Sequence, residues 1–463
     1  MPFGLWRGKE GLKLESIEGW YNILPDLAQY LEPVPPPKGG KKVFQIMVQE
    51  CLKQEMSQDR EIEIPRELQR IFSMTGRPRP LVEAKKLQSA LNTPAQLFYK
   101  AEFYSPTGSH KLNTALAQVF YAKQAGVKRL VTETGAGQWG AAVAYAAKIF
   151  GLEAVVYWVR AAHDRKPERK NFMEKLGAKV FASPSKNTVC GRSLLAGNQN
   201  HQGSLGIAIS EGLEDAISRK DTAYLPSSES TVYVLGSVLN HVLLHQTIIG
   251  LEARRQFEEL GLWPDIVISC LGGGSNFGGI ASPFMKEVLT GERKIRFIAS
   301  QTQAAPSLIK GKYRYDFADH AGLTPKLKMY TLGHKAKLAS SLAEGLRYAS
   351  ASPIISLLRK HGVIEAVSPD ESFVFCCAKL FYNTEGPLPA PVVLPQIADI
   401  GNYDPKRQGF AAPESAYSIA AAVDEALECK KTGEQKIILF NISGHGFLDA
   451  GVYNEAFEKY NIV

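Results

Sequence analysis

The chain has 463 residues, of which 45% are hydrophobic and 22% charged, a balance typical of a folded globular protein and not of a disordered one. The formal net charge of +8 is spread along the chain among acidic residues, which favours a solvated basic surface over a nucleic-acid groove. No apolar stretch is long enough to span a bilayer, because even the run from Val232 to Leu251 is interrupted by polar residues.

Residues 1–76 are predicted to form an N-terminal extension that packs on the main body. Its proline-rich segment at 33–37, followed by glycines and lysines, is expected to be extended and exposed. After this connector, the apolar spacing predicts an amphipathic helix over Val43–Ser57 and a shorter one over Ile62–Phe72.

From about Leu97 onward, strand and helix patterns alternate, which predicts parallel sheets wrapped in helices, an α/β fold. The predicted strands are 97–103, 129–132, 153–159, 178–182, 265–270, 295–300, 363–367 and 436–442. The predicted helices are 111–125, 138–150, 166–176, 277–289, 415–431 and 447–460. The stretch from Gln301 to Ser340 is irregular and is expected to be a large excursion from the core.

Glycine-rich turns follow three of these strands, and parallel sheets bind ligands where strand ends meet helix N-termini. The turn after the 265–270 strand is predicted to hold a phosphate, because its glycines let backbone N–H groups converge and the next helix adds its positive end. This cradle consists of Gly272, Gly273, Gly274, Ser275 and Asn276. A dinucleotide motif fails at Phe277, and a merely tight turn is the alternative.

The turn after the 129–132 strand is predicted to bind a substrate carboxylate through backbone N–H groups ahead of a helix. It consists of Thr134, Gly135, Ala136, Gly137, Gln138 and Trp139. Glu133 lies just before it, where an acid is costly unless it gives or takes a proton. The alternative is an ordinary acidic residue at a helix N-terminus.

Three further residues suit a pyridoxal-phosphate site. Ser443, in the third glycine turn, offers a neutral hydroxyl, which would leave a facing pyridine nitrogen neutral and favour β-elimination over transamination. Lys111 begins a helix, where nearby positive charge lowers its pKa and frees some amine for a Schiff base. The neighbouring His110 is positioned to donate to the phosphate.

Together these segments resemble the tryptophan synthase β-chain family of fold-type II pyridoxal-phosphate enzymes, and most of all its second type. The segments are Gly108–Asn113, Glu133–Gln138, Gly272–Asn276 and Ser443-Gly444, in the family's order. Trp139 stands where the first type has histidine. Similar stretches, including Gly345–Tyr348 and Pro413–Ala416, extend the resemblance from about Trp20 to the C-terminus.

The resemblance implies two three-layer αβα domains with the active site between them. Residues 110–232 would form the N-terminal domain with a mobile lid segment, and residues 77–109 with 233–463 the larger domain that holds pyridoxal 5'-phosphate. Lys111 would hold the cofactor and move the α-proton, and Glu133 would assist loss of the β-hydroxyl. The 134–139 turn would bind the carboxylate, Gly272–Asn276 with His110 the phosphate, and Ser443 would face the pyridine nitrogen.

The implied reaction condenses L-serine, or O-phospho-L-serine, with indole to L-tryptophan through an aminoacrylate. The implied assembly is a cytoplasmic homodimer, aided by a monovalent cation, with an α subunit weakly bound or absent. The alternative is a β-replacement or β-elimination enzyme that uses a different donor or nucleophile.

Three departures from the family bear on that choice. Gln408 stands where the family has a glutamate near the cofactor ring. Ala349 and Ser350 replace a histidine and a glycine, and Tyr417 replaces another histidine. The cofactor-binding groups remain, so the departures leave the leaving group and the acceptor open.

Other features carry weaker expectations. The six cysteines form no Cys-x-x-Cys pair, which predicts reduced thiols, no metal site and no secretion, and the N-terminus lacks a signal-like apolar core. His241 and His245 have a spacing that can bind zinc, but a structural pair is the favoured interpretation. The segments 160–170 and 184–188 are interpreted either as a lid or as solvated surface.

Overall fold

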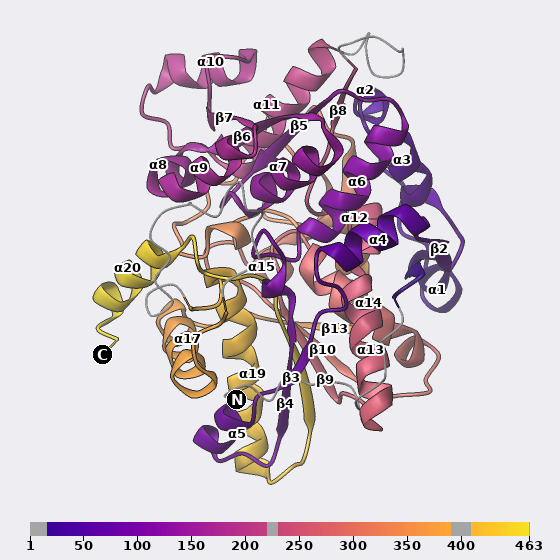
Figure 1. The fold of residues 1–463 in the computed structure, drawn as a ribbon, viewed down its shortest axis with the longest axis vertical. Helices are drawn as coiled ribbons and strands as arrows, with labels where there is room; N and C mark the ends of the chain where they lie inside the picture. The colour runs from indigo at the N-terminus through magenta and orange to yellow at the C-terminus, as the bar shows by residue number, and fades with distance from the viewer. Residues whose placement is uncertain (1–15, 220–229, 390–408, 463) are drawn as a thin grey trace.

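The computed structural model describes residues 16–219, 230–389 and 409–462. Within these ranges the chain builds two main sheets, one of six strands in the order β13-β10-β9-β14-β4-β3 and one of four in the order β7-β6-β5-β8. Figure 1 shows the smaller sheet and its helices in the upper part of the molecule and the larger sheet below. The predicted α/β alternation is therefore confirmed.

In the larger sheet all strands run parallel except the edge strand β3. Its strands are β3 Leu81–Glu83, β4 Gln96–Ala101, β9 Ile266–Cys270, β10 Arg296–Ser300, β13 Ile364–Val367 and β14 Ile437–Ile442. The helices of this part are α5 Lys85–Leu91, α13 Ile248–Leu260, α14 Ser275–Leu289, α15 Ser307–Lys310, α16 Pro353–Lys360, α17 Glu371–Glu385, α19 Pro413–Thr432 and α20 Ala450–Tyr460.

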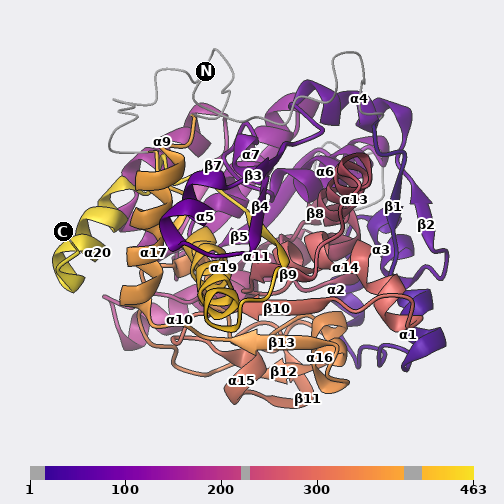
Figure 2. The same cartoon turned by 90° about the horizontal axis from the view of Figure 1, so that it is seen from below.

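The sheet is covered on both faces, because alternate residues of its strands point to opposite sides. In β9, Ile266 and Ile268 belong to the hydrophobic core around α19, whereas Val267 belongs to the core that contains α14. In Figure 2 the long helix α19 is seen end-on beside this sheet. Helices α14 and α19 thus pack on opposite faces of the same sheet.

The smaller sheet is entirely parallel. Its strands are β5 Arg129–Thr134, β6 Glu153–Val159, β7 Lys179–Ser183 and β8 Thr231–Tyr233. Its helices are α6 Leu112–Gln124, α7 Gln138–Phe150, α8 Arg160–Arg165, α9 Pro167–Lys175, α10 Val189–Gly197 and α11 Leu205–Ser218, and α12 Asn240–Gln246 follows it. Because parallel strands end at one edge, the turns after β5, β9 and β14 can meet between the two sheets.

The N-terminal segment differs from its predicted form in two places. Its elements are β1 Gly19–Tyr21, α1 Leu24–Tyr30, α2 Lys41–Gln45, α3 Gln49–Met56, β2 Glu61–Glu63 and α4 Arg66–Met74. The single helix predicted over Val43–Ser57 is interrupted by pairing with β8. The Ile46 carbonyl accepts from the N–H of Tyr233, and Met47 forms a β-bridge with the same residue. The helix predicted over Ile62–Phe72 begins instead with strand β2, paired to β1, and becomes helical only after Pro65.

The excursion predicted from Gln301 to Ser340 contains a regular antiparallel hairpin, β11 Lys312–Phe317 and β12 Lys326–Thr331. One face of the hairpin combines aromatic side chains with lysines, which lie over the rings of Tyr313, Tyr315 and Phe317, so no apolar run marked it as a sheet. The last predicted helix starts later than Phe447, because the Phe447 N–H donates to Nδ1 of His445 in a turn. Among the described helices, none combines the length and apolarity that crossing a bilayer requires.

Candidate active site

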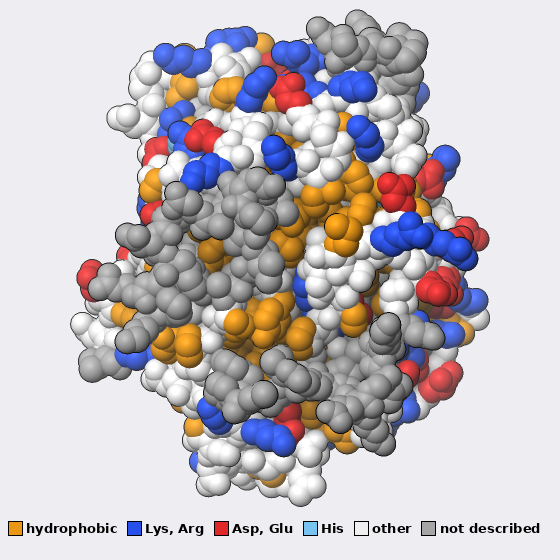
Figure 3. Space-filling view, in the orientation of Figure 1, with side chains coloured by type: hydrophobic (Ala, Val, Ile, Leu, Met, Phe, Trp, Pro, Cys, Tyr) orange, Lys and Arg blue, Asp and Glu red, His pale blue; other side chains and the backbone are white. Residues whose placement is uncertain are grey.

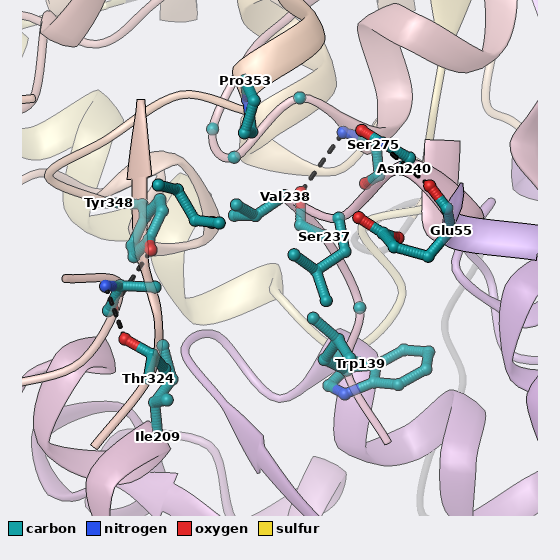
Figure 4. A pocket seen from close by; sticks show the side chains of 18 of the residues that line it. Glu55, Trp139, Ile209, Ser237, Val238, Asn240, Ser275, Thr324, Tyr348 and Pro353 are labelled. Atoms are coloured by element: carbon teal, nitrogen blue, oxygen red, sulfur yellow. Dashed lines mark hydrogen bonds between the residues drawn. The ribbon is translucent and has the colours of Figure 1, made fainter. Parts of the chain in front are cut away.

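A cavity of about 770 Å³ lies between the two sheets and is lined by most of the residues that the sequence singled out. These are His110, Lys111, Glu133, Thr134, Gly135, Ala136, Gln138, Trp139, Gly272, Gly273, Gly274, Ser275, Asn276 and Ser443. Figure 4 shows Trp139, Tyr348 and Pro353 on different walls of this one cavity. The three glycine turns and the candidate lysine therefore converge on a single site.

Lys111 caps the N-terminus of α6 and is partly buried against the cavity. Among the described residues its amine has no hydrogen bond or ion pair. Burial lowers the pKa of the amine, although the carboxylates of Glu414 and Glu133 act in the opposite direction. Such an amine is available as a nucleophile more often than an exposed lysine.

His110 lies beside it and connects two of the glycine turns. Its Nδ1 is 3.3 Å from the carbonyl oxygen of Ser443 and its Nε2 is 3.4 Å from Oγ of Ser275. Burial, followed by the charge of Lys111, holds the pKa of the imidazole well below its usual value, so the ring is neutral. The ring thus connects the Ser443 turn to the Ser275 hydroxyl of the phosphate cradle.

The Gly272–Gly274 turn leaves no room for side chains. A Cβ on Gly273 would lie 2.5 Å from Oγ of Ser237, and Gly274 has φ +121°, a conformation that favours glycine. The dashed bond in Figure 4 joins the Ser275 N–H to the Ser237 hydroxyl. That bond engages the Ser275 N–H, so the donors left for an anion are the N–H groups of Gly272, Gly273 and Gly274, which have no acceptor in the described structure.

Asn276 holds this turn from behind. Its amide nitrogen donates to Oγ of Ser269 at 2.6 Å and to Sγ of Cys270 at 3.1 Å, and its amide oxygen accepts from Asn441. Asn276 was predicted as a member of the phosphate cradle, and these bonds engage its side chain at the end of the sheet. Its contribution to the cradle is its backbone position.

Glu133 ends β5 inside the cavity and is 7% exposed. Burial raises the pKa of its carboxyl to about 7, although the hydroxyl of Tyr233 donates to Oε2 and lowers it. A carboxyl with this pKa exchanges protons readily near neutral pH. No local pattern pointed to Tyr233, because it lies in β8, one hundred residues away in the chain.

The turn after Glu133 is arranged as a set of backbone donors. Gly137, with φ +94°, caps α7, and the Thr134 hydroxyl accepts from the N–H of Gly140 at 3.2 Å. The indole nitrogen of Trp139 donates to Thr132, and that of Trp158 donates to the Gly135 carbonyl. Gly137 itself is not part of the cavity wall, because its place behind the turn is filled by Arg169 and Trp158.

Two buried acids at the cavity were missed by the sequence reasoning. Glu414 accepts from the N–H of Gly345 at 2.8 Å and from Nε2 of Gln138 at 3.2 Å, which fixes the carboxylate turn to the larger sheet. Glu344 pairs with Arg165 and with Lys166 at 3.4 Å. Glu414 lies in the Pro413–Ala416 stretch quoted for the family resemblance and Glu344 directly precedes the Gly345–Tyr348 stretch, but nothing in their local pattern indicated a role.

Ion pairs join α8 and α9 of the smaller sheet to the other side of the cavity. Asp449 accepts from Nζ of Lys166 and from Nη2 of Arg169, each at 2.8 Å, and all three residues are buried. Of the two interpretations of the 160–170 segment, the buried pairs disfavour a purely solvated helix face. The 184–188 segment is instead held by Glu211, which accepts from Ser185 and Thr188.

The departures from the family at Ala349, Ser350 and Tyr417 do not line the cavity. Tyr417 is buried on α19 and donates to Oγ1 of Thr302, and Ser350 donates to Thr331 next to Ala349. Gln408 lies outside the described residues.

The histidine pair on α12 is held by protein groups. Nδ1 of His241 lies 2.8 Å from Glu55, and the two ring nitrogens of His245 contact Thr114 and Gln54. In the described part of the chain, no three His, Cys, Asp or Glu side chains gather as metal ligands. The hydrogen bonds agree with a structural pair.

Comparisons with known proteins converge on one family. The family model described as pyridoxal-phosphate dependent enzyme matches residues 72–393. Tryptophan synthase beta chain 2 of Thermococcus kodakarensis is 48% identical over 441 residues, covering 94% of this chain and 92% of its own. The protein of the same name from Pyrococcus furiosus is also 48% identical, over 95% of this chain and 92% of its own.

Solved structures with low identity share the fold. Processed threonine deaminase isoform 2 from Solanum lycopersicum has a TM-score of 0.57 at 16% identity, covering 96% of this chain and 98% of that one. The L-serine ammonia-lyase from Rhizomucor miehei has a TM-score of 0.56 at 15% identity, covering 82% and 98%. The predicted fold class is confirmed by these neighbours.

Proposed function

Because this chain belongs to the tryptophan synthase β-chain family of pyridoxal-phosphate dependent enzymes, we propose that it is a lyase that joins indole to the β-carbon of serine to form tryptophan. The observation that carries this proposal is the convergence of Lys111, Glu133 and the glycine cradle on one cavity. The cavity is also large and mostly apolar beyond these groups, as a planar aromatic acceptor requires.

The residues present fit pyridoxal phosphate. A Cβ at Gly272 or Gly273 would fill the cradle, lying 3.0 Å or less from Gly345 or Ser237, so the turn is kept open for an anion. Lys111 offers an amine and Ser443 a hydroxyl, and both residues line the same cavity. We infer that Gly272–Asn276 with His110 hold the phosphate, that Lys111 attaches the aldehyde and that Ser443 faces the ring nitrogen.

When bound, pyridoxal phosphate withdraws electrons from the α-carbon of an attached amino acid, which allows the β-substituent to leave. Nζ of Lys111 takes up the α-proton and later returns it. The backbone N–H groups of 135–138, at the start of α7, bind and orient the substrate carboxylate. Gln138 keeps this turn in register through its bond to Glu414.

Glu133 supplies the proton exchange at the β-position. Its carboxyl gives a proton to the departing hydroxyl and afterwards accepts one from the ring of indole. The pKa of about 7 suits both directions at neutral pH, and the Tyr233 hydroxyl keeps the carboxylate oriented.

The acceptor side of the cavity is formed by apolar side chains. Leu205, Ile209 and Leu213 of α11 line it together with Leu235 and Tyr348. Ion pairs of Lys166 and Arg169 with Asp449 hold the two sides together in this closed arrangement. Closure excludes water, which would otherwise divert the reaction to hydrolysis.

We further propose the assembly and setting that the family resemblance implies. These are a homodimer in the cytoplasm, a monovalent cation as an aid, two domains with the boundaries given above, and an α subunit weakly bound or absent. Figure 3 supports the dimer, since hydrophobic side chains gather across the middle of that face. Met74, 86% exposed at the end of α4, and Ile149, 39% exposed at the end of α7, are the kind of residues a partner copy would cover.

The decisive experiment supplies the purified protein with pyridoxal phosphate, indole and either L-serine or O-phospho-L-serine, and identifies the product by mass. Tryptophan from serine is expected. Tryptophan from O-phosphoserine alone would change the donor and leave the reaction intact. Pyruvate or another adduct in both arms would refute the proposed reaction, while borohydride reduction followed by peptide mass analysis at Lys111 tests the cofactor attachment separately.

A further inference from the structure

The hydroxyl of Ser443 has two polar neighbours in the described structure besides the cavity. Oγ of Ser415 lies 2.8 Å from it, and Sγ of Cys270 lies 3.7 Å from it. All three residues are nearly or fully buried, so water does not compete for these bonds. The direction of the Ser443 O–H bond is therefore decided by these two neighbours and by whatever occupies the cavity.

The bonds of Ser415 decide the first contact. Its oxygen accepts from the N–H of Gly444 at 3.0 Å, so its own proton must find an acceptor elsewhere. The candidates are Oγ of Ser443 at 2.8 Å and the carbonyl oxygen of Gly444 at 3.5 Å. The shorter contact has the usual length of an O–H···O bond and the longer one is at the limit, so Ser415 donates to Ser443.

Cys270 makes the weaker contact. Its sulfur lies 3.1 Å from the amide nitrogen of Asn276, which also reaches Oγ of Ser269 and the Cys270 carbonyl oxygen, and 3.7 Å from Oγ of Ser443. At that distance the sulfur is at most a weak acceptor for the Ser443 proton. Burial raises the pKa of this thiol, so the proton is present. Ser415 therefore occupies one lone pair of the Ser443 oxygen, the thiol contact beside it is long and weak, and the Ser443 proton remains for an acceptor in the cavity.

The electrostatic surroundings agree with a neutral ring nitrogen. Ser415 lies in the first turn of α19, a helix of 20 residues whose positive end disfavours a further positive charge nearby. Glu414, the adjacent acid, has its carboxylate bonded to the Gly345 N–H and to Gln138, on the side of the substrate turn. No carboxylate among the described residues contacts Ser443 to favour a protonated ring.

We propose that Ser415 is a positioning residue, whose hydroxyl donates to Oγ of Ser443 and so directs the Ser443 proton to the ring nitrogen of the bound cofactor. This inference rests on the proposed function, because it takes pyridoxal phosphate as the occupant of the site. A ring nitrogen that only accepts a hydrogen bond stays unprotonated, and an unprotonated ring favours replacement at the β-carbon over transamination. Ser415 thus acts on reaction specificity without touching the substrate.

The test loads the enzyme with pyridoxal phosphate labelled with nitrogen-15 in the ring and records the chemical shift of that nitrogen. In Ser415→Ala, Ser443 regains a free lone pair, and the shift is expected to move toward that of a protonated ring. Conversion of the cofactor to its amine form during incubation with serine alone is expected to rise several-fold. Ser415→Thr keeps the hydroxyl and is expected to restore both readouts.

The matched control is Ser418→Ala, which removes another buried hydroxyl from α19, one that accepts from the Cys270 N–H and has no contact with Ser443. Its nitrogen shift is expected to equal that of the unaltered enzyme. An unchanged shift in Ser415→Ala at full cofactor occupancy overturns the proposal, as does an equal change in Ser418→Ala. If Ser415→Ala does not fold, Ser415→Cys, which is close in volume and a poor donor, carries the same expectations. Failure of the unaltered enzyme to attach the cofactor at Lys111 refutes the proposed function instead.

Discussion

Two lysines, the buried Lys100 and the half-buried Lys111, lie eleven residues apart and are surrounded in opposite ways. Nζ of Lys100 uses all three donors, on the Arg79 carbonyl at 2.6 Å, Glu252 at 2.8 Å and Gln256 at 2.9 Å. Nζ of Lys111 has no such partner in the described structure and faces the cavity. Burial lowers the pKa of both amines, so burial alone does not distinguish them.

The two lysines differ in the charged groups that compensate their burial. Around Lys100, Glu252 also accepts from Arg77 at 2.8 Å, and Arg77 pairs with Glu102 at 2.7 Å, which makes a closed cluster of four charges. Around Lys111 the acids Glu133 and Glu414 are bonded to other groups. A closed cluster serves the fold, whereas an incomplete one is ready to engage a ligand.

The largest effect is expected from Lys111→Ala, which should abolish activity without lowering stability. Lys111→Ala should lower kcat for tryptophan formation by ~10⁴-fold or more, because it removes both the attachment and a proton transfer that by itself is worth ~10²–10⁴-fold. Its melting temperature without cofactor should equal or exceed that of the unaltered chain, since an unpaired buried amine is removed. A calorimetric scan and the rate assay check the two statements, and a marked loss of stability would contradict the contrast.

Glu133→Gln tests whether the Glu133 carboxyl transfers protons in the cavity. We expect kcat to fall by about 10²–10⁴-fold, since the amide neither gives nor accepts the proton at the β-position. Burial raises the pKa of Glu133, so ionisation costs stability as the pH rises through about 7, and the variant should melt no lower than the unaltered chain at pH 8. Rate measurements at pH 7 and thermal melts at pH 6 and pH 8 are the readouts. Full activity in the variant would exclude Glu133 from proton transfer.

Lys100→Met tests the closed cluster. Removal of one partner leaves Glu252 undercompensated in the interior, and such losses cost ~3–5 kcal/mol of unfolding free energy. Lys53→Met is the matched control, because Lys53 pairs with Glu50 at 2.9 Å with 75% of its side chain exposed and should be neutral within error. Urea unfolding of both variants measures the difference, and equal midpoints would show that the Lys100 cluster is not structural.

A smaller effect is expected from Gly273→Ala in the phosphate cradle. The added Cβ would lie 2.5 Å from Oγ of Ser237, so the turn or the serine must shift, at a cost of ~1–3 kcal/mol. Because the cradle is a ligand site, the loss should appear as a weaker Kd for pyridoxal phosphate, measured by fluorescence titration. Gly197→Ala is the control, because Gly197, like Gly273, has no positive φ, and no atom lies within 4 Å of its built Cβ. A Kd that is equally affected in both would argue against the cradle.

The same contrast explains what was predictable from the sequence. The glycine turns at 134–139 and 272–276 and the helix that starts after Lys111 are local signals, because chain conformation and backbone donors are set by neighbouring residues. Strand β2 and the break at Ile46–Val48 were mispredicted as helix, because their form is set by pairing with β1 and β8. Tertiary pairing overrides helical spacing in such short segments.

Some residues of the site were not predicted, again because their roles depend on partners that are distant in the chain. Tyr233, Glu414 and Ser415 act on Glu133, Gln138 and Ser443, partners that lie far away in the chain. A buried serine on a helix carries no local mark of the hydroxyl that it meets. The sequence therefore predicted the residues that would touch a ligand and could not predict the residues that orient them.

The smallest expected effect, and the sharpest, comes from Tyr233→Phe. The Tyr233 hydroxyl donates to Oε2 of Glu133 and lowers the pKa of that carboxyl against the larger effect of burial, which sets the value at about 7. Without the hydroxyl the ionised form loses a donor, so the pKa must rise. A hydrogen bond to a charged group is worth ~1.5–3 kcal/mol, and one pH unit corresponds to ~1.4 kcal/mol, so a rise of about one to two units is expected.

The step that needs ionised Glu133 then begins at higher pH, and the acid limb of kcat/KM against pH should move upward while the activity above pH 9 is largely kept. Tyr348→Phe is the control, because its hydroxyl, in the same cavity, donates to the Ala318 carbonyl at 3.1 Å and should leave the limb in place. An acid limb that stays still or moves downward in Tyr233→Phe would mean that Glu133 is not the titrating group. Glu133 could then no longer be contrasted with Glu252 as an acid that serves chemistry and not stability.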